Sequence, residues 1–188
     1  MKIQDKASGL KLLKAYDLNI VPSQVVFVDE LSTAKDFMEK YPANEYVMRN
    51  LNSVLGGVHF ISNFDEFKKY VGEYETSLLL SVSMRDYNEN KVLLGDLRIN
   101  KASNIIELTA KDDEDADHRN LYDNPKYVIN GKTLDEVLDM DDIDGLADIL
   151  LYAIKHALYD MYIEFVVFDR PVGTKNEKVL IYELRTDY

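Results

Sequence analysis

Cysteine is absent from the 188-residue sequence, and histidine occurs only three times. The absence of cysteine excludes disulfide bonds, thiolate metal sites and cysteine nucleophiles. The histidines, His59, His118 and His156, are too far apart in the sequence for a familiar zinc-binding spacing. If the protein holds a metal ion, we therefore expect oxygen ligands.

Basic residues are scarce relative to acidic ones. The sequence has 22 Lys and Arg against 34 Asp and Glu, and its formal net charge is -12. This surplus repels a phosphate backbone unless the basic residues cluster, so the composition argues against nucleic acid as a partner. No run of 18 or more apolar residues occurs, and residues 1–13 lack the apolar core of a secretory signal. We expect a cytoplasmic protein that does not enter a membrane.

What the sequence does contain is an ordinary globular composition, with 46% hydrophobic and 30% charged residues. Hydrophobic spacing in the first half predicts helices and strands in alternation. The expected helices cover residues 5–16, a stretch that begins at Ser32 or Thr33 and ends near Pro42, and a stretch capped by Asn63. The expected strands follow Pro22, cover 45–50 and cover 58–62, with a glycine loop before the last.

The second half predicts more strands and one long helix. Residues 77–86, 90–100 and 104–110 have the pattern of a three-stranded antiparallel meander. The acidic stretch 111–126 reads either as a solvated loop or as a substrate or lid loop. Apolar residues at helical spacing predict a helix over 142–159, and two apolar strands close the chain as a hairpin. The predicted fold class is α+β with mostly antiparallel sheets.

The closing hairpin contains the most informative charges. Glu164 and Glu183 lie on neighbouring apolar strands, where a carboxylate is costly to bury unless it is compensated. If the strands pair about a loop near residues 172–176, both side chains point to one face and offer two oxygen ligands to Mg²⁺. Alternatively, they face solvent or pair with Arg185 and Arg49.

A second candidate site follows the strand that ends at Arg49. Gly56 and Gly57 occupy the loop after it, where backbone without a Cβ atom can approach phosphate oxygens closely. The order of strand, arginine, Val-Leu-Gly-Gly, strand and helix is similar to the nucleotide-binding segment of carbamoyl-phosphate synthetase and other ATP-grasp enzymes.

Other segments resemble the ATP-grasp domain of pyruvate phosphate dikinase and phosphoenolpyruvate synthase. Residues 5–26 resemble the opening lysine-containing helix, turn and strand of that family, which places Lys6 at the phosphate-binding lysine. The strands "YIEFVVFD" and "VLIYELR" resemble its closing hairpin, which implies Mg²⁺ ligation by Glu164 and Glu183 and phosphate contact by Arg185. A looser resemblance of residues 93–110 places Glu107 near the nucleotide.

The resemblance implies a single reduced ATP-grasp domain over residues 1–188, with a glycine-loop lobe at 1–75 and a metal and nucleotide lobe at 76–188. It implies a protein that binds Mg-ATP between the lobes and transfers a phosphoryl group to a carboxylate or similar acceptor on a small molecule or protein. The implied nucleotide ligands are Lys6, Arg49, Gly56, Gly57 and Glu107. The alternative is a non-catalytic binding or regulatory protein of the same fold, whose acidic surface meets a basic protein partner.

Overall fold

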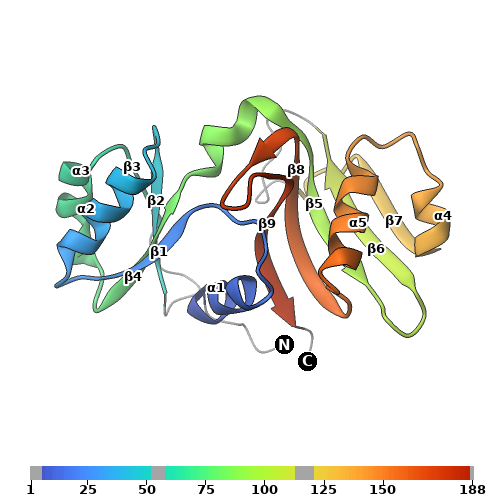
Figure 1. Cartoon of the computed structure of the whole chain (residues 1–188), viewed down its shortest axis with the longest axis horizontal. Coiled ribbons are helices and arrows are strands. Elements are labelled where there is room, and N and C mark those ends of the chain that lie inside the picture. Colours follow the sequence, from blue (N-terminus) through green and yellow to red (C-terminus); the bar gives the residue numbers. More distant parts are fainter. Residues whose placement is uncertain (1–5, 52–57, 113–120, 187–188) are drawn as a thin grey trace. The chain divides into compact units, whose positions relative to one another are not determined.

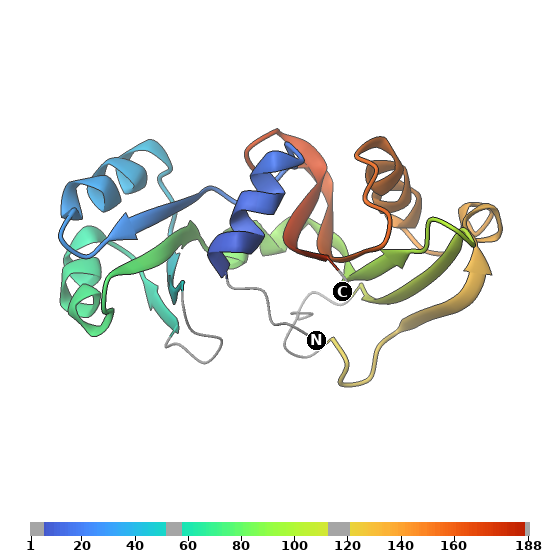
Figure 2. The same cartoon turned by 90° about the horizontal axis from the view of Figure 1, so that it is seen from below.

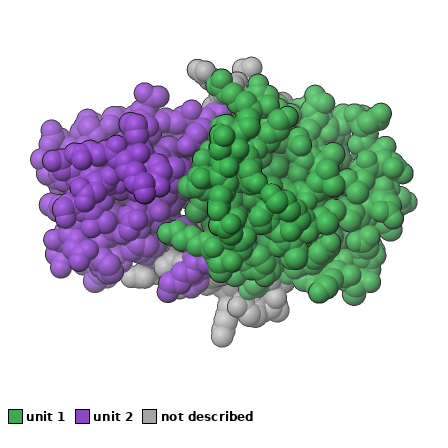
Figure 3. All heavy atoms as spheres, in the orientation of Figure 1, with its two compact units in different colours: residues 1, 12–20, 89–188 green, residues 2–11, 21–88 purple. Residues whose placement is uncertain are grey.

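The computed structural model describes residues 6–51, 58–112 and 121–186. The chain divides into two compact units, which Figure 3 shows in different colours. Unit 2 comprises residues 2–11 and 21–88, and unit 1 comprises residue 1, residues 12–20 and residues 89–188. None of the helices in the described part of the chain is long and apolar enough to cross a membrane.

Unit 2 is a four-stranded antiparallel sheet with two helices packed against it (Figure 1). The strand order is β1-β4-β2-β3. The elements are β1 (Ser23–Phe27), α2 (Leu31–Lys40), β2 (Tyr46–Asn50), β3 (Val58–Ile61), α3 (Phe64–Tyr70), β4 (Ser77–Val82) and the 3-10 turns Val71–Glu73 and Met84–Asn90. The helix α1 (Lys6–Ala15) precedes them, and its residues are divided between the two units.

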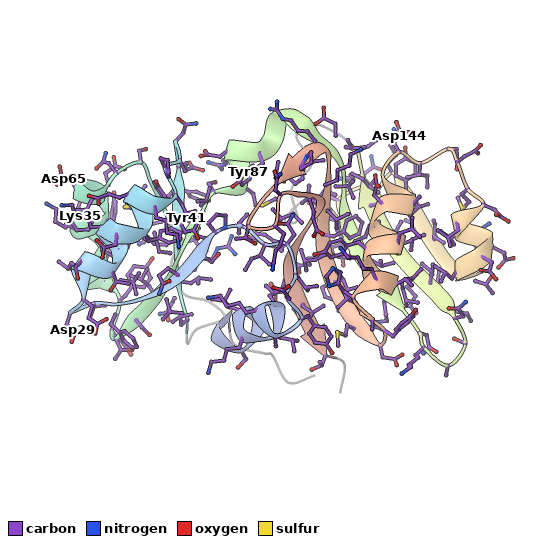
Figure 4. All side chains as sticks on the ribbon, viewed as in Figure 1. Asp29, Lys35, Tyr41, Asp65, Tyr87 and Asp144 are labelled. Carbon is purple, nitrogen blue, oxygen red and sulfur yellow. The ribbon has the colours of Figure 1, made fainter. Side chains whose placement is uncertain are left out.

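The helices of unit 2 bury one apolar face and expose the other. Phe37 and Met38 of α2 and Phe67 of α3 lie in a buried cluster with Met48, while Figure 4 shows Lys35 pointing outward. The Asn63 side chain accepts a hydrogen bond from the Glu66 backbone N–H, so the predicted cap of α3 is confirmed.

Unit 1 contains a five-stranded antiparallel sheet in the order β7-β6-β5-β8-β9. Its elements are β5 (Lys91–Ile99), β6 (Ile105–Lys111), β7 (Tyr127–Thr133), α4 (Leu134–Leu138), α5 (Leu146–Lys155), β8 (Met161–Val172) and β9 (Glu177–Thr186). Figures 1 and 2 show α4 and α5 together on one face of this sheet. Because side chains alternate along a strand, Leu93 and Val167, which lie beside Gly145 just before α5, face these helices. Asp96 lies three residues after Leu93 on β5, and Glu164 lies three residues before Val167 on β8, so both face the opposite side of the sheet.

The structure confirms the α+β class and the closing hairpin, and it corrects several local predictions. The predicted three-stranded meander is wrong, because β4 pairs with β1 and β2 in unit 2 whereas β5 pairs with β6 and β8 in unit 1. Hydrophobic alternation alone does not tell which strand a neighbour in sequence will join. The residue at the N-cap of α2 is Glu30, without a side-chain cap, and not Ser32 or Thr33.

The end of the acidic stretch also differs from the prediction. The predicted loop covers residues 111–126, of which 113–120 lie outside the described residues. After it the chain forms β7 and α4, which were not predicted, and the long helix is confined to α5. The strand β7 was missed because it is a mostly exposed edge strand with little apolar alternation. The helix α4 is short, but Thr133 and Glu136 form a capping box at its start.

One buried amide ties the segment after α1 to the closing hairpin of unit 1. The Asn19 side chain is fully buried, and its Nδ2 donates to the carbonyls of Val172 and Val179 at 3.0 and 2.8 Å. Its Oδ1 accepts from the Lys175 backbone N–H at 2.8 Å. A Cβ atom at Gly173 would lie 2.6 Å from this Oδ1, and Gly173 also has a φ of +76°, so the turn of the hairpin requires glycine.

Replacing this amide should destabilise unit 1. In Asn19→Ala the hairpin carbonyls and the Lys175 N–H lose their buried partner, and we expect a loss of about 2–4 kcal/mol in the free energy of unfolding. Urea unfolding with hydrogen exchange at the amides of β8 and β9 measures the loss. Asn130→Ala, at an exposed position of β7, is the matched control and should change little. Equal effects of the two substitutions would contradict this role for Asn19.

Two buried tyrosines make the fold sensitive to alkali. Burial raises the pKa of Tyr74 in unit 2 and of Tyr152 in unit 1 to about 12. Tyrosine in the unfolded chain ionises near pH 10, as an approximate reference value, so the folded state resists ionisation that the unfolded state accepts. We therefore expect stability from these groups to be complete below pH 10 and to be lost as the pH rises toward 12. Between pH 8 and pH 12 the urea midpoint should fall less steeply with pH in Tyr74→Phe than in the wild-type protein. The same pH dependence in both proteins would contradict this assignment.

Candidate functional site

The side chains of Glu164 and Glu183 face each other across the last two strands. Glu164 of β8 pairs in register with Glu183 of β9, and Tyr162 pairs with Arg185. The predicted register of the two carboxylates is therefore confirmed. The register shifts directly after Glu164, where Phe165 pairs with Ile181, so β9 has a bulge beside the site. A bulge of this kind lets a strand redirect its side chains locally.

Arg185 joins the two carboxylates. Its Nε donates to Glu183 Oε1 at 2.7 Å, and its Nη2 donates to Glu164 Oε1 at 3.1 Å. The Glu164 and Glu183 side chains are 11% and 14% exposed, whereas Arg185 is 33% exposed. Like charges directly opposite each other destabilise an antiparallel pair, and this guanidinium offsets part of that repulsion.

A tyrosine supports the guanidinium from β8. The Arg185 guanidinium carbon lies 5.0 Å from the centre of the Tyr162 ring, within the range of a cation–π contact. Burial lowers the pKa of Arg185, but the hydrogen bond to Glu183 and the charges of Glu183 and Glu164 outweigh it, so this pKa lies above its ordinary value. Tyr162, Glu164, Glu183 and Arg185 thus form one block of four side chains, which we call the hairpin block.

The negative charge continues onto β5. Asp96 pairs in register with Glu164, so Asp96, Glu164 and Glu183 form a row across three adjacent strands. The Tyr122 hydroxyl donates to Asp96 and lies 3.2 Å from the Tyr162 hydroxyl. Burial raises the pKa of both tyrosines, and hydrogen bonding with Asp96 raises it further. Both hydroxyls therefore keep their protons at neutral pH.

The same face holds further charges on β5 and β6. Thr109 is the register partner of Asp96, and Glu107 and Lys111 lie two residues to either side of it, so all of them share that face. Lys111 is buried, and its Nζ donates to the Asp123 carbonyl at 2.7 Å. Glu107, predicted to lie near a nucleotide, is paired with Arg98 at 3.5 Å. Glu107 is on the same face of the sheet as the hairpin block, but it lies on β6, and β5 separates β6 from the hairpin strands β8 and β9.

The other predicted residues belong to the N-terminal part of the chain. Arg49 lies on β2 of unit 2 and pairs in register with Val58 and Leu79. Lys6 is the first residue of α1, but its side chain is outside the described part, and Gly56 and Gly57 lie outside the described residues altogether. The phosphate-binding roles of these four residues remain predictions.

The hairpin block is suited to a metal only together with other ligands. Within the described residues, no group of three or more His, Asp or Glu side chains is arranged to hold a metal ion. Mg²⁺ is commonly held by one or two carboxylates with phosphate oxygens and water completing its shell. Glu164 and Glu183 fit a Mg²⁺ shell that phosphate and water complete, because they supply two carboxylates from one register position.

Sequence reasoning missed several residues of this face. Asp96 carried a usable signal, since it is a charged residue within the apolar strand "VLLGDLRI", as Glu164 is within its own strand. Tyr162 and Lys111 could have been found from the same alternation once the register was known. Tyr122 gave no signal, because it follows the acidic stretch and reaches Asp96 only through the fold.

The compensating role of Arg185 predicts a measurable loss of stability. In Arg185→Gln the two carboxylates lose the guanidinium, and we expect unit 1 to lose about 1–3 kcal/mol at neutral pH. Arg98→Gln is the matched control, because the Arg98–Glu107 pair is 39% and 55% exposed and such pairs contribute about 0–1 kcal/mol. Urea unfolding compares the two, and a loss in Arg98→Gln as large as in Arg185→Gln would contradict the assignment.

Comparisons with known proteins bear on the fold. No family model and no curated protein sequence matches the chain. Among solved structures it is similar to the D-alanine-D-alanine ligase from Helicobacter pylori, with TM-score 0.55 and 14% identity over 96% of this chain and 53% of that one. It is also similar to N5-carboxyaminoimidazole synthetase from Staphylococcus aureus complexed with ADP, with TM-score 0.56 and 15% identity over 98% and 45%.

A third similar structure is the D-alanyl-alanine synthetase A from Vibrio cholerae, with TM-score 0.53 and 12% identity over 97% of this chain and 54% of that one. The chain thus spans about half the length of the solved structures it matches. The narrower resemblance to pyruvate phosphate dikinase and carbamoyl-phosphate synthetase remains a prediction. The two antiparallel sheets with their helices and these similarities together show that the chain has the ATP-grasp fold.

Proposed function

We propose that this protein binds Mg-ATP at the hairpin block and transfers a phosphoryl group to a carboxylate or similar acceptor. The observation that supports this most directly is the register pairing of Glu164 with Glu183, joined by Arg185 on one face of the sheet. Buried like charges at one register position are costly, and a site for a nucleotide-bound cation gives them a use. The likeness to the synthetase complexed with ADP agrees with a nucleotide ligand.

The charges of the site indicate how it selects its ligand. Asp96, Glu164 and Glu183 form a row of three carboxylates, and Arg185 bonds to two of them. A bare nucleotide phosphate would be repelled by this row, so we expect nucleotide binding to depend on a divalent cation. Bound Mg²⁺ would neutralise phosphate charge and polarise the transferred phosphoryl group.

The protein's own residues would act by positioning and charge. Glu164 and Glu183 would fix the cation relative to the sheet, and Arg185 would present its planar donors to a phosphate oxygen. Phosphoryl transfer of this kind needs no protein nucleophile, because alignment of the acceptor and neutralisation of charge lower the barrier. The Tyr122 hydroxyl donates to Asp96 and lies beside the Tyr162 hydroxyl, so it links Asp96 to the hairpin block.

The acidic surface supports a second candidate function, a non-catalytic module that binds a basic protein partner. Around α4 and the start of α5 an acidic surface is formed by exposed Asp135, Glu136, Asp139, Asp141, Asp142, Asp144 and Asp148. Figure 4 labels Asp144 at the turn before α5. A concentration of one charge sign attracts partners of the opposite sign. This surface lies over the helices, whereas the hairpin block is on the other face of the sheet.

A substitution in the hairpin block tests nucleotide binding. Glu183→Gln keeps the size of the side chain but removes one anionic ligand, so we expect Mg-ATP to bind at least about tenfold more weakly, equivalent to about 1.4 kcal/mol. A thermal-shift titration with ATP, ADP and GTP, with and without Mg²⁺, measures this, because ligands of the native state raise the melting temperature. The wild-type protein should show a shift for ATP only when Mg²⁺ is present.

Glu39→Gln provides the control, because Glu39 is exposed on α2 in an i,i+4 pair with Lys35. It should leave the Mg-ATP shift unchanged. The absence of any wild-type shift at millimolar Mg-ATP, combined with binding of a basic polypeptide such as polylysine at low salt, would favour the binding module instead.

A further inference from the structure

We propose that Arg185 is a built-in counterion that a divalent cation must displace before it binds Glu164 and Glu183. This inference rests on the proposed function, since it concerns the cation of the same site. It starts from the guanidinium itself, which contacts one Oε1 atom of each carboxylate at 2.7 and 3.1 Å. The two carboxylates therefore already share a cationic partner in the absence of a metal.

A metal and the guanidinium would share the same two carboxylates, of which Arg185 contacts the Oε1 atoms. Mg²⁺ binds its oxygen ligands at about 2.1 Å in a near-octahedral shell and tolerates little distortion. A cation placed between Glu164 and Glu183 would lie within a few ångströms of the Arg185 guanidinium, and the repulsion of like charges rises as their separation falls. Binding of the metal therefore favours withdrawal of Arg185 from at least one carboxylate.

The surroundings allow Arg185 to withdraw without unfolding the strand. Its side chain is 33% exposed, in contrast to the two carboxylates, and Thr186 next to it is the last residue of β9. The Tyr162 ring at 5.0 Å offers the guanidinium an apolar support that does not depend on the carboxylates. Rotation about side-chain bonds is therefore sufficient for release.

Release of Arg185 couples cation binding to phosphate recognition. In the described geometry the Nε and Nη2 edge of the guanidinium is engaged by the two carboxylates, whereas a released side chain can present this edge for paired hydrogen bonds to a phosphate. The cation and the arginine thus exchange roles when Mg-ATP arrives. Removal of Arg185 should consequently affect the metal and the nucleotide in different ways.

The test uses Mn²⁺ alone, followed by electron paramagnetic resonance, on the full chain. Arg185→Gln removes the competitor, and we expect it to bind Mn²⁺ about tenfold more tightly than wild type. Its affinity for Mg-ATP should not rise in parallel, because the phosphate contact is lost. A purely structural role for Arg185 would weaken both ligands together. Arg98→Gln, on the same face, should leave the Mn²⁺ affinity unchanged.

Equal or weaker Mn²⁺ binding in Arg185→Gln than in wild type would overturn the proposal. If this variant does not fold, Arg185→Lys keeps a charge without the planar fork and should bind Mn²⁺ with intermediate affinity. The Arg185 Nε–H resonance of the wild-type protein should also shift on addition of Mg²⁺, and a resonance that does not move at saturation would count against displacement. Absence of Mg-ATP binding in the wild-type protein and in Arg98→Gln would contradict the proposed function but not the competition measured with Mn²⁺.

Discussion

The pairing of two like charges across β8 and β9 is the constraint on which the candidate site depends. The register of this hairpin brings Glu164 and Glu183 opposite each other, next to the buried apolar residues Ile163, Phe165 and Leu184. Such a pair persists only with a cation, and in this chain Arg185 provides it from the same strand as Glu183.

The remainder of unit 1 fixes this register. The strand β8 lies between β5 and β9, so a slip by one residue would turn its buried side chains toward the charged face. Asn19 holds the turn of the hairpin through carbonyls on β8 and β9, and Gly173 leaves room for its amide oxygen. Gly95, next to Asp96, is equally restricted, because a Cβ atom there would lie 2.5 Å from the Thr109 carbonyl oxygen.

The sequence allowed the α+β class, the closing hairpin and the register of its carboxylates to be predicted, because these follow from alternation and from the cost of buried charge. It did not reveal that β4 joins the first sheet, since strand pairing between distant segments leaves no local pattern. Asp96 and Tyr122 were missed because they meet only after β5 and residues beyond the acidic stretch come together. From the sequence, pairing of the carboxylates with Arg185 is an alternative to metal binding; we propose that the two occur in succession.

The central claim is that the hairpin block holds the cation of a bound nucleotide. The most direct measurement is a crystal structure of the chain with Mn²⁺ and a non-hydrolysable ATP analogue, in which anomalous scattering locates the metal. The account predicts a peak between the carboxylates of Glu164 and Glu183, at about 2.0–2.3 Å from their oxygens, and Arg185 on a phosphate. A nucleotide bound elsewhere, with Arg185 still joined to both glutamates, would contradict it.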